Sequence, residues 1–67
     1  MNKFKDRLKE LLFENGMSQT TLAKKIFVSQ GVVSRYCAGK IMPSLDILIA
    51  ICKELDVSAD YLLGLLD

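Results

Sequence analysis

The chain has 67 residues, of which 51% are hydrophobic and 25% are charged, so it has the size of one small domain covering residues 1–67. Its longest unbroken apolar run, ILIAIC at residues 47–52, is too short to span a bilayer, and the N-terminus is too charged for a signal peptide. The chain has no histidine, and its two cysteines form no CxxC motif, so we expect no metal, no cofactor and no enzyme activity.

The formal net charge of +1 is unevenly distributed along the chain. Residues 18–40 hold four basic side chains and no acidic one, whereas residues 41–67 hold five acidic side chains and one lysine. An acid-free central segment followed by an acidic one indicates a single basic face suited to a polyanion.

The first predicted element is an amphipathic helix that ends near Asn15-Gly16, where glycine can adopt the left-handed conformation that closes a helix. Its apolar residues recur with helical spacing at Phe4, Leu8, Leu11 and Leu12. Four later serines occupy positions where further helices would begin, because a serine side chain accepts a hydrogen bond from a backbone N–H of the first turn. These are Ser18, Ser29, Ser44 and Ser58.

The four serines open four more predicted helices, and no segment alternates in the manner of a strand. The expected inward residues are Leu22, Ala23 and Ile26 in the second helix, and Val33, Tyr36 and Cys37 in the third. The fourth helix is apolar nearly all round, which predicts a central, buried position. Its main apolar face is expected at Leu45, Leu48, Ile49, Cys52 and Leu55. A C-terminal helix at about residues 58–66 completes an all-α fold.

The outward face of the third helix carries unusually small side chains for a helix that faces only water. Gly31, Val32 and Ser34 are mediocre to poor helix formers, each costing from a few tenths to about 1 kcal/mol relative to alanine. The B-DNA major groove, about 12 Å wide, admits an α-helix with little room to spare. We therefore interpret the small residues as allowing Gln30 to reach adenine and Arg35 to reach guanine, each contact worth roughly 1–3 kcal/mol in discrimination, with Val32 near a thymine methyl.

The link between the second and third helices is very short, because only Phe27 and Val28 precede the capping Ser29. Such a link forces the helices to cross steeply, as in a helix-turn-helix unit at about residues 18–38. From Lys5 to Leu65 the sequence resembles the phage-repressor and Cro-like (XRE-type) helix-turn-helix family. The resemblance rests on SQTTLAKKI, VSQGVVSRY, AGK, PSLDILIAICKELDVS and ADYLLGL at matching spacing.

This resemblance implies a compact five-helix domain like that of lambda repressor. It also implies a sequence-specific regulator of transcription that binds double-stranded DNA in the cytoplasm of a bacterium or a phage-infected host. We expect a repressor of phage, mobile-element or bacterial origin, bound as a homodimer to a palindromic operator. The predicted DNA contacts are Gln19, Thr20, Ser29, Gln30, Gly31, Val32, Ser34, Arg35 and Lys40. In the family, the glutamine that matches Gln19 also braces the residue that matches Gln30.

The sequence departs from the family pattern at two places. Phe27 stands where the family usually has glycine, so a left-handed backbone there would cost about 1 kcal/mol or more. Leu12 and Cys37 replace a frequent arginine–glutamate pair with apolar residues, which is often neutral or stabilising. We expect both Cys37 and Cys52 to be buried, reduced thiols, with a disulfide as the alternative.

The C-terminal segment has more apolar residues than so small a core requires. We expect a dimer interface there, formed by Tyr61, Leu62, Leu65 and Leu66. Two alternatives stay open: an antitoxin-like or other protein-interaction module with the same fold, and a C-terminal helix on a membrane surface. The acidic charge of this end argues against the second alternative, because anionic lipids would repel it.

Overall fold

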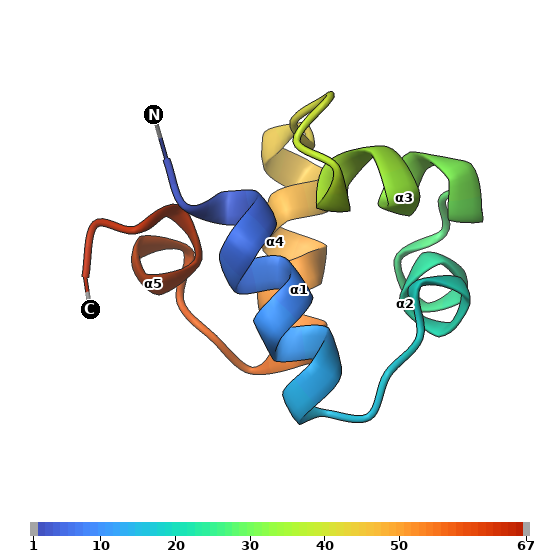
Figure 1. The fold of residues 1–67 in the computed structure, drawn as a ribbon, viewed down its shortest axis with the longest axis horizontal. Helices are drawn as coiled ribbons and strands as arrows, with labels where there is room; N and C mark the ends of the chain where they lie inside the picture. Colours follow the sequence, from blue (N-terminus) through green and yellow to red (C-terminus); the bar gives the residue numbers. More distant parts are fainter. Residues whose placement is uncertain (1, 67) are drawn as a thin grey trace.

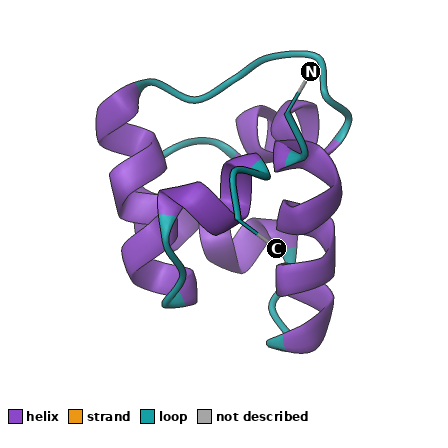
Figure 2. Ribbon diagram, turned by 90° about the vertical axis from the view of Figure 1, so that its left-hand side faces the viewer, coloured by secondary structure: helices purple, strands orange, loops and turns teal. Residues whose placement is uncertain are grey.

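The computed structural model describes residues 2–66, which contain only helices, turns and loops (Figures 1 and 2). The helices are α1 (Phe4–Glu14), α2 (Gln19–Ile26), α3 (Gln30–Cys37), α4 (Leu45–Leu55) and α5 (Ala59–Leu63). The predicted fold class is therefore confirmed, while Met1 and Asp67, the ends of the predicted domain, lie outside the described residues.

All four predicted serine caps are formed. The side chains of Ser18, Ser29, Ser44 and Ser58 accept hydrogen bonds of 3.0, 3.3, 3.2 and 3.1 Å from backbone N–H groups three residues further along. Each bond satisfies one of the N–H groups that the first turn of a helix leaves without a partner. The helix starts were therefore readable from sequence because the cap is a local interaction.

The core draws residues from all five helices. It consists of Phe4, Leu8, Leu11, Leu12, Leu22, Ala23, Ile26, Val33, Tyr36, Cys37, Leu48, Ile51, Leu55 and Leu62. Helix α2 packs on α3 and α4, while α1 packs on α3 and α5, and α4 also contacts α5. As a result α2 and α3 lie on one side of α1 and α4, and α5 lies on the other side (Figure 1).

Helix α4 is not buried all round, contrary to the prediction. Leu48, Ile51 and Leu55 face the core, but Leu45 is 79% exposed and Ile49 is 52% exposed. The helix carries two apolar stripes, and the other four helices provide a surface for only one of them.

The C-terminal helix is also shorter than predicted. It ends at Leu63 because Gly64 adopts a left-handed conformation with φ of 86°. The backbone N–H groups of Leu65 and Leu66 then turn back to donate to the carbonyl of Asp60, at 2.8 and 3.2 Å. The apolar sequence LLGLL suggested a continuous helix, but the glycine ends it.

Among residues 2–66, no helix has the length and apolar character needed to cross a membrane.

Candidate functional site

The turn between α2 and α3 has the left-handed geometry that the family pattern implies. Phe27 adopts φ of 61° and ψ of 42°, and its N–H donates to the carbonyl of Ala23. The N–H of Val28 donates to the same carbonyl at 3.0 Å. Because the side chain of Phe27 is 93% exposed, it gains almost no burial that would offset the backbone strain.

The inner face of α3 is anchored to the rest of the domain. Val33, Tyr36 and Cys37 are buried, as predicted. The ring of Tyr36 contacts Phe4 of α1 edge to face, with centroids 6.1 Å apart. The packing leaves the opposite face of α3 accessible, and that face carries Gln30 and Arg35.

Gln30 is exposed but held in place from α2. Its Nε2 donates a hydrogen bond of 3.2 Å to Oε1 of Gln19. The bracing of Gln30 by Gln19 that the family resemblance implied is therefore present. Because the bond uses one N–H of Gln30, the other N–H and the Oε1 atom remain available on the outward side.

Gly31 is not required by the packing of the protein. A Cβ atom at this position would meet only Nη1 of Arg35 at 3.8 Å and Oγ of Ser29 at 3.9 Å, both ordinary van der Waals distances. The fold would therefore accept alanine here.

The other predicted contact residues surround this face. Thr20, Ser29 and Lys40 are exposed, whereas Val32 and Ser34 are half-buried. The hydroxyl oxygen of Ser29 accepts the capping bond from Val32, so its own O–H can still donate. The sequence from Asn15 to Leu45 carries no acidic residue, so no carboxylate of α2, α3 or their connecting turn lies on this surface.

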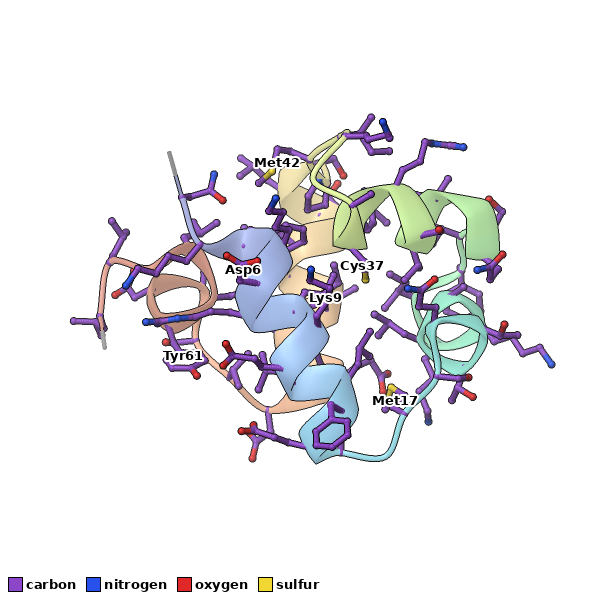
Figure 3. All side chains as sticks on the ribbon, viewed as in Figure 1. Asp6, Lys9, Met17, Cys37, Met42 and Tyr61 are labelled. Atoms are coloured by element: carbon purple, nitrogen blue, oxygen red, sulfur yellow. The ribbon has the colours of Figure 1, made fainter. Side chains whose placement is uncertain are left out.

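The two thiols differ in their environment. Burial raises the pKa of the Cys37 thiol, while the positive charge of Lys9 and a side-chain hydrogen bond with Gln19 lower it (Figure 3). Burial also raises the pKa of Cys52, which is only half-buried, so the prediction that both thiols are buried holds for Cys37 alone. Both cysteines are free, in agreement with the expected reduced state.

The lysines of α2 lie outside the predicted contact set. Lys25 approaches Glu54 of α4 at 4.0 Å, and Lys24 is exposed. An exposed ion pair of this kind contributes little to stability, but it partly neutralises the charge of Lys25.

The predicted dimer interface is wrong at one residue. Leu62 is fully buried in the core, so it has no surface to offer a partner. Tyr61 is half-buried under the guanidinium of Arg7, whose carbon atom lies 4.2 Å from the ring centroid (Figure 3). Leu65 and Leu66 are exposed, as expected.

The structure contains a groove between α4 and α5 that was not predicted from the sequence. It has a volume of about 580 Å³ and is lined by Leu45, Leu48, Ile49, Cys52, Lys53, Asp56, Val57, Ser58 and Ala59. The available signal was that Leu45, Ile49 and Cys52 form a stripe of their own, separate from the stripe of Leu48, Ile51 and Leu55. In this structure only the stripe of Leu48, Ile51 and Leu55 is buried in the core.

Residues 8–62 match the family described as helix-turn-helix. An HTH-type transcriptional regulator of Bacillus subtilis (strain 168), YobD, is 36% identical over 61 residues, which make up 91% of this chain and 54% of that protein. The chain therefore spans about half the length of this relative. A transcriptional regulator from Listeria innocua superposes with a TM-score of 0.92 at 25% identity, over 100% of this chain and 63% of that one. The P22 c2 repressor, solved in complex with a synthetic operator, superposes with a TM-score of 0.86 at 28% identity, over 90% of this chain and 91% of the repressor.

Proposed function

The chain belongs to the helix-turn-helix family, and from this membership we propose that it is a sequence-specific DNA-binding regulator of transcription. In this proposal α3 enters the major groove of duplex DNA in the bacterial cytoplasm. A repressor is the simplest form of such a regulator, because occupying an operator needs no second activity.

The outward face of α3 is the observation that carries the proposal. The amide of Gln30 is oriented by Gln19, and its remaining N–H and oxygen match N7 and N6 of adenine. The guanidinium of Arg35 is exposed and can donate to O6 and N7 of guanine. Between them Gly31 adds no bulk, so the backbone of the helix can approach the base edges closely.

Contacts to phosphates would position the domain on the duplex. At the start of α2, the backbone N–H groups of Gln19 and Thr20 have no partner within the helix. The O–H groups of Ser29 and Ser34 are short donors beside the reading face. Lys40 follows directly after the C-terminal turn of α3 and supplies a positive charge.

Selection of binding sites from random duplex DNA tests this function. We expect one enriched motif, which loses a preferred base when Gln30→Ala or Arg35→Ala is used. Lys24→Ala is the matched control, because it removes an exposed positive charge from α2 without touching the face of α3. Its motif should stay unchanged. Failure of the wild-type protein to enrich any motif would favour the antitoxin-like, protein-binding alternative.

The α4–α5 groove supports a revised dimer interface. Leu45 and Ile49 are exposed apolar side chains beside it, and Lys53 and Asp56 are among its lining residues. A two-fold axis through the groove would bring Lys53 of each copy near Asp56 of the other, so the charges are self-complementary. We therefore propose a homodimer through this groove.

Sedimentation of the free protein and of its DNA complex tests the dimer. We expect two protomers per palindromic operator, with half-sites about 10–10.5 bp apart or a multiple of that spacing. Ile49→Lys should weaken self-association at least tenfold, because it places a charge in an apolar interface, whereas Lys24→Ala should not. The dimer should also slow alkylation of Cys52, which lines the groove. One protomer per operator would rule the dimer out.

A further inference from the structure

The side chain of Lys5 connects the first turn of α1 to the turn that closes α3. Its methylene groups lie over Gly39, whose missing Cβ atom would be 2.7 Å from Cδ, 3.6 Å from Cε and 3.7 Å from Cγ of Lys5. The chain turns at Gly39, which has a φ of 74°, and the N–H of Lys40 then donates to the carbonyl of Arg35 at 3.0 Å. Lys5 therefore packs on the turn that joins Arg35 to Lys40.

A hollow of about 390 Å³ lies beside this contact, between the start of α1 and the loop after α3. It is lined by Asn2, Lys5, Gly39 and Met42, and we call it the α1–α3 hollow (Met42 is labelled in Figure 3). Oδ1 of Asn2 accepts a hydrogen bond of 3.0 Å from the N–H of Phe4, so the Nδ2 group of Asn2 can donate to another molecule. None of the four lining residues is acidic.

The positive charge of Lys5 is not neutralised by an ion pair. Within the described part of the chain, neither Lys5 nor Lys40 lies within ion-pair distance of a carboxylate, and both side chains are exposed. Asp6, the acidic neighbour of Lys5 in the sequence, is instead paired with Lys9 at 3.9 Å. The fold thus brings two lysines without carboxylate partners to one turn, where an anion would interact favourably with both.

We propose, on the basis of the DNA-binding function above, that the α1–α3 hollow binds a phosphate group of the DNA backbone. The ammonium group of Lys5 and the amide of Asn2 supply N–H donors for phosphate oxygens. When the first residues of α3 contact base edges, the turn after α3 lies toward the sugar–phosphate wall of the major groove. Helix α1, which carries none of the contacts predicted from the sequence, thereby extends the interface beyond α3.

The first test removes the charge of Lys5 but keeps methylene groups over Gly39. For the duplex obtained by selection, Lys5→Met should reduce the slope of log K against log[salt] by about 0.9 per protomer, whereas Lys5→Arg should keep the slope. The matched control is Lys3→Met, because the methylene groups of Lys3 also lie over a glycine, with Cγ 2.9 Å from the missing Cβ of Gly64, but on the side of α5. No change in Lys5→Met, or an equal change in Lys3→Met, would overturn the inference.

The second test locates the phosphate. Single phosphates of the selected duplex are replaced in turn by neutral methylphosphonates, and the affinities of the wild-type protein and of Lys5→Met are compared. We expect one position in each half-site at which the replacement weakens binding of the wild-type protein but not that of Lys5→Met. If both proteins respond alike at every phosphate, the inference is wrong while the proposed function stands. A wild-type protein that enriches no motif would overturn both.

Discussion

At the scale of single residues, Phe27 is held in a left-handed conformation that favours glycine. The backbone strain should cost about 1 kcal/mol or more, and the exposed ring adds little stabilising burial to offset it. We expect Phe27→Gly to raise the free energy of unfolding by about 1 kcal/mol in urea denaturation. Phe13→Gly is the control, because Phe13 is also exposed, at 88%, but lies within α1. It should lower the stability, and a similar loss for Phe27→Gly would contradict the argument.

In the proposed function, Gly31 lowers the stability of α3 and lets its backbone approach the base edges. Glycine inside a helix costs roughly 0.5–1 kcal/mol relative to alanine, and nothing in the fold obstructs a Cβ atom here. We expect Gly31→Ala to raise the free energy of unfolding by about this amount, measured by thermal denaturation, and to weaken binding to the selected duplex.

Gly39 is the contrasting position for this experiment. Its φ is 74°, and a Cβ atom would lie 2.7 Å from Cδ of Lys5. Gly39→Ala should therefore destabilise the protein.

The prediction for Gly31 has a clear contrary outcome. If Gly31→Ala were stabilising and also bound DNA more tightly, the absence of a side chain at Gly31 would have no role in the approach to the major groove.

At the scale of elements, Arg7 joins α1 to α5 and the segment after it. Its Nη1 atom donates to the carbonyls of Tyr61 and Leu66, both at 2.6 Å, and its guanidinium covers the ring of Tyr61. Hydrogen bonds from a charged donor are worth about 1.5–3 kcal/mol, and the contact with the ring adds to them. Because α5 has only five residues, it depends on such contacts rather than on its own helical propensity.

We expect Arg7→Ala to lower the free energy of unfolding by about 2 kcal/mol and to accelerate hydrogen exchange at residues 61–66. Arg7→Lys should recover only part of the loss, because lysine lacks the planar fork of arginine. Lys9→Ala is the control on the same helix, since its exposed pair with Asp6 at 3.9 Å contributes little. Unchanged exchange in Arg7→Ala would show that α5 is held by its apolar contacts alone.

At the scale of the whole molecule, the net positive charge is concentrated in residues 18–40 and is modest. After Lys40 the chain continues with Ile41 and Met42, two exposed apolar residues that add no positive charge. We therefore expect a weak dependence of DNA affinity on salt, because few phosphates are neutralised.

The contribution of Lys40 can be measured directly. If it neutralises one phosphate per protomer, Lys40→Ala should reduce the slope of log K against log[salt] by about 0.9 per protomer. Lys24→Ala should leave the slope nearly unchanged. Equal changes in both variants would mean that the charge acts through the net field of the protein rather than through a contact.

Much of the fold followed from local chemistry that the sequence displays directly. A serine cap, a glycine after the last turn and an apolar residue every three or four positions each act within one helix. For this reason the starts of α2 to α5, the end of α1 and the inward faces of α2 and α3 were predicted correctly. The exposed positions of Gln30 and Arg35 followed from the same periodicity.

Where the helices have more apolar surface than one core can bury, the tertiary structure determined which residues are buried. Helix α4 carries two apolar stripes. Its packing on α2 and α5 buries Ile51 and leaves Leu45 and Ile49 exposed. Similarly, Leu62 became a core residue rather than an interface residue because α5 ends at Gly64 and packs on α1 and α4. Helix boundaries depend on hydrogen bonds between near neighbours, whereas burial depends on segments far apart in the chain. The sequence alone therefore determined the helix starts and the outward position of Gln30 and Arg35, and the packing of the helices determined which apolar surface stays exposed.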